Sequence, residues 1–316
     1  MALNKTKLEA MATPCPQRGN LELVHYSSRA YALEAIFGEA PIPMEKSMWV
    51  YTPYGYDSRK KYNVLFLMHG GTENEGYWFG QGRYHADDTE KYTDFGNVTA
   101  AMLDHLIYEK EIEPLIVVAP SFEENVEPYT KLGNPVDTYF APTRYFWLEL
   151  RNEIMPYVQQ HYATYAQSNS EDSYRAAREH FAYAGASQGS ITGLYSIMGH
   201  CLDRFGYIGN FSAGAIRYSF NTNGLAVVLD EEKLSELCAS AEQNPPILWY
   251  NACGDEDMMY ASHKETYDRV LEALPADFQD NQNCCFITHE GGQHDYRTWV
   301  EDFYNVLHMF FRPKES

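Results

Sequence analysis

Short, continuously apolar runs recur along the chain and are separated by longer stretches with helical spacing. The runs fall at 63–68, 115–119, 180–184, 247–251 and 284–288. A run that is apolar at nearly every position is typical of a strand covered on both faces, as in a parallel sheet. Two earlier stretches, 21–26 and 47–52, lie among prolines and predict antiparallel strands joined by turns.

Between the runs, apolar residues recur at three- and four-residue spacing, which predicts helices at 98–110, 145–162, 189–200 and 264–274. Pro156 lies within the second of these and is expected to kink the helix or to start a new one. Strands that alternate with helices predict an α/β fold, with a mostly parallel sheet and helices on both faces. Because neither an internal repeat nor a long linker interrupts the pattern, we expect one domain at 21–316, preceded by a polar leader at 1–20.

Composition and charge narrow the classes of function. The 316 residues include 44 acidic and 24 basic side chains, a net charge of −20, so the chain lacks the positive footprint that a nucleic-acid partner requires. No apolar stretch approaches the length of a membrane-spanning helix, and residues 1–20 contain no apolar segment of a secretion signal. These features predict a cytoplasmic protein without a membrane partner; the alternative is a secreted protein whose signal has been removed. None of the six cysteines forms a C-x-x-C pair, so the sequence predicts no metal site.

The first candidate for chemistry is a G-x-S-x-G motif at Gly185–Gly189, which follows an apolar run and precedes a predicted helix. This context, from strand to helix, is the one in which the motif forms a nucleophile elbow. Small neighbours permit the sharp turn that lifts the serine hydroxyl out of the sheet, and the helix N-terminus favours developing negative charge. Ser187 is therefore the candidate nucleophile.

A serine hydroxyl needs a base and an orienting acid, and beyond such an elbow these follow in the order acid, then histidine. His294 lies in a glycine-rich loop after the last apolar run, from which a side chain can reach the elbow, and His289 is the second choice. The acid is expected after the run at 247–251, where three carboxylates follow one another. Spacing alone does not choose between Asp255 and Asp257.

Acyl transfer also needs donors for the oxyanion of a tetrahedral intermediate. One is expected from the backbone N–H of Gln188, the residue after the nucleophile. The second is expected from the H-G-G-type loop after the run at 63–68, at Gly71 or Thr72. Glycines there allow the backbone to face the reacting carbonyl, and we expect His69 to orient this loop rather than to act as a second base.

Aromatic residues make up 15 % of the chain. Tyr77, Trp78 and Phe79 follow the H-G-G loop closely enough to line a pocket for an aromatic acyl group. The alternative is that Trp78 belongs to the core and anchors the loop. The polar stretch at 123–139 is expected to be a loop that covers the site as a lid.

These segments together resemble the α/β-hydrolase superfamily and, within it, the esterase group that contains the family 1 carbohydrate esterases, including feruloyl esterases. The resemblance covers about 49–311 and rests on the segments 51–56, 61–71, 153–158, 185–189, 211–214, 254–257 and 291–299. It implies an α/β-hydrolase fold and a serine esterase that needs no metal or organic cofactor. In this group the acid commonly ends a G-x-x-D segment, so the resemblance selects Asp257. The implied substrate is a hydroxycinnamate ester of a plant sugar, either a small molecule or an oligosaccharide.

Two other functional classes remain open. One is a different esterase of the same group, such as a sugar acetylesterase or an S-formylglutathione hydrolase. The other is a hydrolase-fold protein that binds a ligand without catalysis, which the complete set of serine, aspartate and histidine disfavours.

Overall fold

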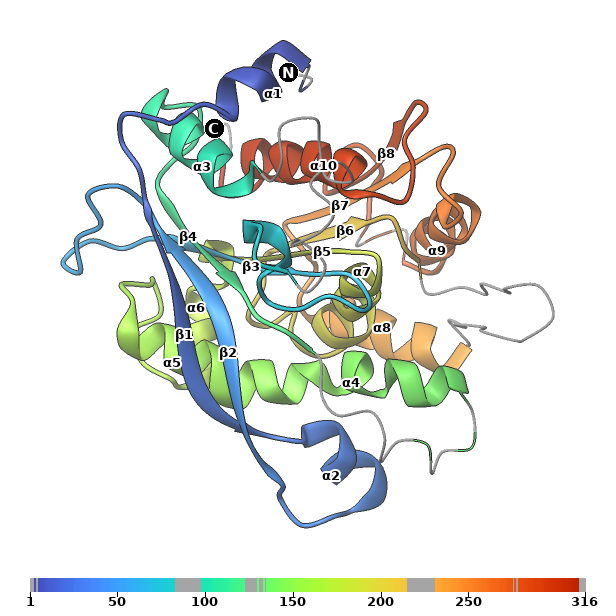
Figure 1. Cartoon of the computed structure of the whole chain (residues 1–316). Helices are drawn as coiled ribbons and strands as arrows, with labels where there is room; N and C mark the ends of the chain where they lie inside the picture. The colour runs from blue at the N-terminus through green and yellow to red at the C-terminus, as the bar shows by residue number, and fades with distance from the viewer. Residues whose placement is uncertain are drawn as a thin grey trace.

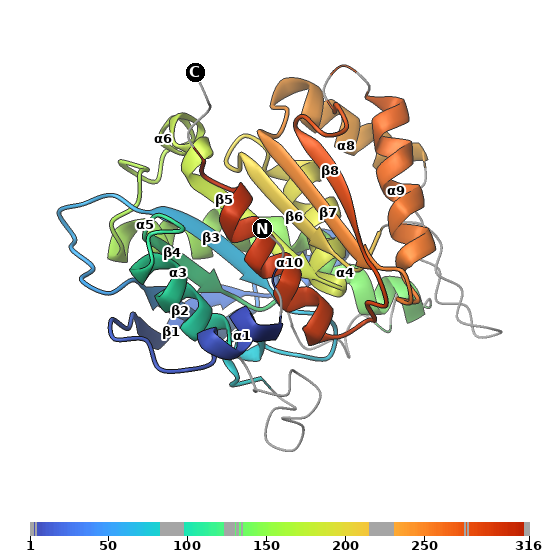
Figure 2. The same ribbon diagram turned by 90° about the horizontal axis from the view of Figure 1, so that it is seen from above.

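The computed structural model describes residues 5–82, 98–122, 135–214, 231–274 and 278–312, together with residues 3, 130, 133 and 276. Within that part of the chain, strands form one sheet in the order β1-β2-β4-β3-β5-β6-β7-β8. Their bounds are β1 Asn20–Arg29, β2 Pro43–Thr52, β3 Asn63–Met68, β4 Leu115–Ala119, β5 Phe181–Ala186, β6 Tyr207–Phe211, β7 Leu248–Gly254 and β8 Cys284–His289. β1 and β2 pair antiparallel, β2 joins β4 antiparallel, and all pairs from β4 to β8 are parallel (Figure 2).

Helices cover both faces of this sheet (Figure 1). One face carries α1 Lys5–Met11, η1 Tyr77–Phe79, α3 Thr99–Tyr108 and α10 Tyr296–Met309. The other carries α4 Pro135–Glu149, η4 Leu150–Ile154, α5 Met155–His161, α6 Glu171–Ala176, α7 Gln188–Thr192, η6 Gly193–Met198, α8 Glu231–Gln243 and α9 Tyr260–Ala273. Two short helices remain. α2 Tyr31–Phe37 connects β1 to β2, and η5 Arg178–His180 directly precedes β5. The prediction of a mostly parallel sheet with helices on both faces is confirmed.

The alternation of side chains along β3 explains why its sequence is apolar at almost every position. Val64 and Phe66 pack into the core on the side of α4 and α5, whereas Leu65 and Leu67 pack into the core on the side of α3 and α10. All four side chains are at most 1 % exposed. A strand covered on both faces has no solvent-facing position for a polar residue, which is the pattern that predicted the central strands.

The second predicted helix differs from the structure in its start. It was expected at 145–162, but α4 begins at Pro135 and runs through Pro142. A π-helical turn, η4, then leads into α5, where Pro156 occupies the first turn. The residues before it already have helical dihedral angles, so the N–H that proline lacks falls at the junction between η4 and α5, and Pro156 marks the start of a new helical segment as expected. Of the stretch predicted as a lid, 123–129, 131, 132 and 134 lie outside the described residues, and 135–139 form the first part of α4 rather than a loop.

A helix also forms within the stretch predicted as a polar leader. The Nζ of Lys7 on α1 donates to both carboxylate oxygens of Glu111 and to the Tyr304 hydroxyl, each at 2.8 Å. The same carboxylate lies 3.0 Å from Nε2 of His308. Met11, the last residue of α1, is buried. These contacts join α1 to the end of α3 and to α10.

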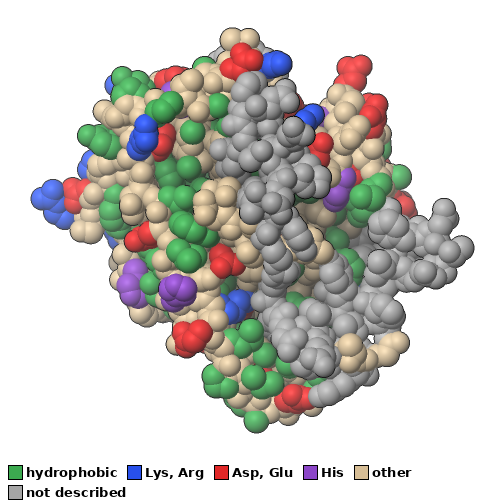
Figure 3. All heavy atoms as spheres, viewed as in Figure 1, with side chains coloured by type: hydrophobic (Ala, Val, Ile, Leu, Met, Phe, Trp, Pro, Cys, Tyr) green, Lys and Arg blue, Asp and Glu red, His purple; other side chains and the backbone are tan. Residues whose placement is uncertain are grey.

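On the face shown in Figure 3, the described lysine and arginine side chains are scattered among acidic and hydrophobic ones and do not gather in a patch. This arrangement agrees with the excess of acidic residues in the sequence. Across the described residues, no helix is both long and apolar enough to span a membrane.

Candidate active site

The turn between β5 and α7 holds Ser187 in a strained backbone conformation. Its φ of +52° and ψ of −115° fall in a region that residues other than glycine rarely adopt. The Ser187 N–H donates to the carbonyl of Phe211, at the end of β6, at 2.8 Å. The neighbouring strand therefore holds the turn in place, and the serine occupies the sharp elbow that the sequence predicts.

The two glycines of the motif are required by close backbone approach. A Cβ atom on Gly185 would lie 2.6 Å from the backbone of Gly189. A Cβ on Gly189 would lie 2.6 Å from the carbonyl oxygen of His69 and 2.8 Å from that of Met68. Both separations are shorter than a carbon atom permits. The elbow thus packs directly against the end of β3 and the loop that follows it.

The structure brings Ser187, His294 and Asp257 together in one hydrogen-bonded row. Nε2 of His294 lies 2.9 Å from Oγ of Ser187, and Nδ1 lies 3.0 Å from each carboxylate oxygen of Asp257. The three residues come from the loops that follow β5, β7 and β8. These loops meet because the carboxyl ends of parallel strands lie at the same edge of the sheet, where such folds place their binding sites.

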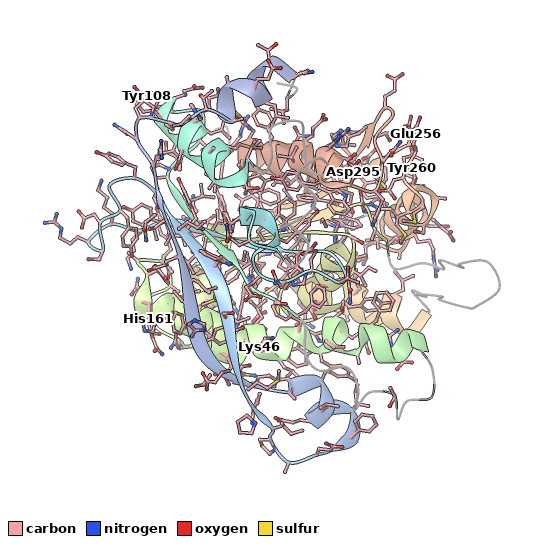
Figure 4. All side chains as sticks on the ribbon, viewed as in Figure 1. Lys46, Tyr108, His161, Glu256, Tyr260 and Asp295 are labelled. Carbon is pink, nitrogen blue, oxygen red and sulfur yellow. The ribbon has the colours of Figure 1, made fainter. Side chains whose placement is uncertain are left out.

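The contacts of the three neighbouring carboxylates distinguish the one that pairs with His294. Among Asp255, Glu256 and Asp257, Asp257 is buried and contacts His294, whereas the other two are exposed. Asp255 accepts from the Gly291 N–H at 2.7 Å, and Glu256 accepts from the side chain of Gln293 at 3.2 Å. Asp257 also accepts from the Met259 N–H at 2.7 Å, which fixes its orientation. Figure 4 labels Glu256 at the outer side of this loop.

His289, the second choice for the base, is engaged in a different contact. Its Nε2 lies 2.6 Å from Oδ1 of the fully buried Asp302, and its Nδ1 lies 3.2 Å from Glu301. Burial lowers the pKa of His289, but its bonds to Asp302 and Glu301 outweigh burial and raise that pKa from 6.5 to about 10. At neutral pH this imidazole carries both protons and has no lone pair with which to accept another. His289 therefore links β8 to α10 instead of serving as a base.

Stability is expected to depend on pH through this ion pair. A histidine whose folded pKa is raised to about 10 stabilises the fold fully below its ordinary pKa, and the contribution is lost as pH rises through 10. Replacing His289 by glutamine should lower the free energy of unfolding by about 3 kcal/mol at pH 6. Urea unfolding of both proteins at pH 6, 8 and 10.5 measures the difference, which should shrink by more than half at the highest pH. A difference that is constant with pH would show that His289 is neutral in the folded protein.

The loop after β3 lies against the nucleophile. A Cβ on Gly70 would sit 3.3 Å from Cβ of Ser187, so this backbone passes beside the serine. Thr72 has a φ of +66°, the left-handed conformation, which turns the chain away from β3. His69 is buried, stacks on Phe122, and has Nδ1 2.6 Å from the Gly70 carbonyl oxygen. It thus holds the loop, as expected.

Gln188 is the first residue of α7. Its side-chain amide donates to Oγ1 of Thr143 on α4 at 2.8 Å. The side chain therefore contacts α4, and the backbone N–H lies at the amino end of the helix, directly after Ser187.

A cavity of about 250 Å³ opens above the serine. Its lining combines the H-G-G loop, the elbow, the histidine loop and the first turn of α10: Gly70, Gly71, Thr72, Glu73, Tyr77, Ser187, His294, Asp295, Tyr296 and Trp299. Asp295 lies at the start of α10 (Figure 4) and caps that helix by accepting from the Thr298 N–H at 3.1 Å. The ring of Trp299 meets that of His294 edge to face at 5.1 Å.

The structure corrects part of the predicted aromatic pocket. Trp78 is fully buried, its indole N–H donates to the Met68 carbonyl at 2.9 Å, and its ring packs on Phe211, Tyr296 and Phe303. Neither Trp78 nor Phe79 lines the cavity, whereas Tyr77 does. Tyr77 and Trp78 are neighbours in the short helix η1, so one aromatic run supplies both a core anchor and a cavity wall.

Outside the H-G-G loop and the elbow, four residues of the cavity wall were not predicted: Glu73, Asp295, Tyr296 and Trp299. Tyr296 and Trp299 are three residues apart at the start of α10 and so share one side of the helix. The signal that would have found them is the helix cap, because an aspartate at 295 followed by a threonine at 298 marks a helix start directly after His294.

Comparisons with known proteins identify the family to which this chain belongs. Residues 42–310 match the model of a family described as "Putative esterase". The endo-1,4-β-xylanase Y of Acetivibrio thermocellus is 30 % identical over 312 residues, which are 96 % of this chain and 24 % of that protein. An endo-1,4-β-xylanase/feruloyl esterase of Xylanibacter ruminicola is 25 % identical over 271 residues, 83 % of this chain and 29 % of that protein. The chain thus spans about a quarter of the length of these two relatives.

Solved structures are similar over nearly the whole chain. A mutant of the feruloyl esterase module from Clostridium thermocellum, complexed with sinapinate, is 27 % identical with a TM-score of 0.71, covering 100 % of this chain and 95 % of that one. A ferulic acid esterase from Anaeromyces mucronatus in complex with ferulic acid is 23 % identical with a TM-score of 0.70, covering 98 % and 96 %. These likenesses confirm the predicted α/β-hydrolase fold.

Proposed function

Because the chain belongs to this esterase family, we propose that it is a serine carboxylic-ester hydrolase and, within that class, a feruloyl esterase that releases phenolic acids from plant sugar esters. The observation that carries the proposal is the hydrogen-bonded row Ser187–His294–Asp257, of which the serine and the histidine line a partly aromatic cavity. A buried carboxylate, an imidazole and a strained serine in this order form the arrangement that activates a serine for acyl transfer.

The proposed first step is attack of Ser187 Oγ on the ester carbonyl carbon. His294 Nε2 accepts the hydroxyl proton, since it lies 2.9 Å from that oxygen, and then donates it to the leaving alcohol. Asp257, bonded to Nδ1, keeps the imidazole in the tautomer that can accept this proton and stabilises the imidazolium. Water activated by the same imidazole then releases the acid from the acyl-enzyme.

Backbone N–H groups stabilise the oxyanion in this proposal. One is that of Gln188, at the start of α7, and the second comes from Gly71 or Thr72 in the loop beside the serine. Donors that are held in place before the reaction stabilise the developing charge without reorganisation, and the loss of one typically costs about 10²- to 10³-fold in rate.

The choice of a hydroxycinnamate ester is supported by the cavity wall and by the comparisons. Three aromatic side chains, Tyr77, Tyr296 and Trp299, line the cavity and offer faces and edges to a phenolic ring. The xylanase/feruloyl esterase relative and the structure with bound sinapinate belong to proteins named for this activity.

A panel of three substrates tests the proposal: methyl ferulate, p-nitrophenyl acetate and acetylated xylan. We expect release of ferulate with a kcat/KM well above that for the acetyl ester, and little acetate from xylan. Preference for acetylated xylan would indicate a sugar acetylesterase. Absence of hydrolysis of all three, in a folded protein, would indicate a binding protein on the same fold.

Tyr77 offers a prediction on acyl specificity. Replacing Tyr77 by leucine removes an aromatic wall of the cavity, so KM for methyl ferulate should rise by about fivefold, the equivalent of roughly 1 kcal/mol, with little change for p-nitrophenyl acetate. Phe79→Leu is the matched control, because Phe79 is equally buried in the same short helix but does not line the cavity. Equal changes for both esters, or in both variants, would mean that Tyr77 acts only by supporting the loop.

A further inference from the structure

A buried ion pair lies behind the H-G-G loop. Nζ of Lys46 on β2 lies 2.7 Å from Oε2 of Glu149, the last residue of α4, and the two side chains are 7 % and 2 % exposed. Oε1 of Glu149 accepts from the Tyr26 hydroxyl at 3.0 Å and from the Ser28 hydroxyl at 2.8 Å. Figure 4 labels Lys46 where β2 passes α4. Since burial of an ion pair costs desolvation, such a pair is weak evidence for stability and invites another explanation.

The lysine connects this pair to the loop after β4. Nζ of Lys46 also donates to the backbone carbonyl of Ser121 at 2.8 Å. The hydroxyl of that serine lies 2.8 Å from Nε2 of His69, and Nδ1 of His69 lies 2.6 Å from the carbonyl oxygen of Gly70. A carbonyl oxygen only accepts, so Nδ1 carries the proton. In the neutral ring, Nε2 then accepts from the Ser121 hydroxyl.

The last bond in this series fixes the direction of a backbone donor. The carbonyl of Gly70 and the N–H of Gly71 belong to one planar trans peptide, in which C=O and N–H point in opposite directions. Holding the carbonyl with His69 therefore sets the direction of the Gly71 N–H. An accepted hydrogen bond also polarises the peptide and strengthens its N–H as a donor. Gly70 approaches Ser187 closely enough that an added Cβ would lie 3.3 Å from the serine Cβ.

We propose that Lys46 and Glu149 are positioning residues for the oxyanion donor, acting through Ser121 and His69 to direct the Gly71 N–H toward the substrate carbonyl. The inference rests on the proposed ester hydrolysis and deepens it, because it assigns the second donor to Gly71 rather than to Thr72. It predicts a loss in the transition state, where the oxyanion develops, with little loss in substrate binding.

Two independent variants test this series of contacts from Glu149 to Gly70. Ser121→Ala removes the hydroxyl, and Ser121→Thr restores it. The double variant Lys46→Met/Glu149→Leu removes both charges at once, so no uncompensated charge remains in the core and the fold is retained. The matched control is Lys7→Met/Glu111→Leu, which removes a second ion pair that joins α1, α3 and α10 away from the loop. Circular dichroism and thermal unfolding verify that each protein is folded.

For Ser121→Ala and for the double variant at 46 and 149, kcat for methyl ferulate should fall by about 10- to 100-fold, with KM within threefold of the wild type. Affinity for a phenylboronic acid, which forms a tetrahedral adduct with the serine, should fall in parallel with kcat/KM. The inhibition constant of coniferyl alcohol, a neutral analogue that keeps the phenolic ring and carries no carboxylate, should be unchanged. Ser121→Thr and the control variant should retain kcat within threefold.

The inference is overturned, and the proposed function is retained, if the wild type hydrolyses the ester and both test variants keep kcat within twofold. It is also overturned if the control variant loses as much activity as they do, since general loosening of the fold then accounts for the effect. A folded wild-type protein without esterase activity would overturn the proposed function, and this inference with it.

Discussion

Replacement of Ser187 by alanine is expected to lower kcat/KM for any hydrolysed ester by about 10⁶-fold, the scale seen when the nucleophile of a serine hydrolase is removed. The reason is chemical: without Oγ no acyl-enzyme forms, and water must attack the ester directly. The variant should still bind methyl ferulate, because the cavity wall is otherwise intact. Initial-rate measurements, together with labelling by a fluorophosphonate probe that reacts with activated serines, provide the test.

Ser190 is the matched control for this experiment. It lies three residues further along, in α7, and its hydroxyl donates to the Ala213 carbonyl at 2.5 Å, so it takes part in packing and not in the row of catalytic candidates. Ser190→Ala should retain activity within tenfold and still be labelled. Residual activity of Ser187→Ala within a hundredfold of the wild type would exclude Ser187 as the nucleophile.

Replacement of Asp257 by asparagine is expected to lower kcat by about 10⁴-fold with little change in KM. The amide keeps the shape of the side chain, but its NH₂ group can face Nδ1 of His294 and force the proton onto Nε2. In that tautomer Nε2 cannot accept the proton of Ser187. The direct contacts at 3.0 Å between Asp257 and His294 are the basis of this expectation.

Asp255→Asn is the informative comparison, since spacing in the sequence left these two carboxylates equivalent. Asp255 accepts from the Gly291 N–H at the exposed side of the loop, so its replacement should cost less than tenfold. A severe loss in Asp255→Asn with a mild one in Asp257→Asn would reverse the assignment of the acid.

The central strands could be predicted because the sheet covers both of their faces. β6, at Tyr207–Phe211, escaped prediction because Gly209 and Asn210 interrupt its apolar pattern. Asn210 is nevertheless buried, since its amide donates to Ser190 and its oxygen accepts from the indole of Trp249. Partners that lie 20 and 39 residues away along the chain satisfy this polar side chain, and no local pattern reveals them.

The site residues likewise fall into two groups: those that a local sequence pattern predicts and those that depend on the tertiary fold. The elbow around Ser187 and the loop around Gly71 are local turns with recognisable glycine motifs. The sequence therefore predicts both directly. The selection of Asp257 depends on the path of a loop in space, and only the family resemblance supplied it. The role of Trp78 was left open, because which side of a short helix faces the cavity is decided by the tertiary fold.

A selection for thermal stability alone would act against the nucleophile of this protein. Ser187 is held at a φ of +52°, and a residue other than glycine in so rare a conformation costs of order 1–3 kcal/mol. Glycine at this position would relieve the strain, so variants enriched for resistance to heat would include molecules that fold better and hydrolyse nothing. Engineering of a more robust enzyme on this scaffold must therefore score turnover in every round and seek its added stability away from the elbow.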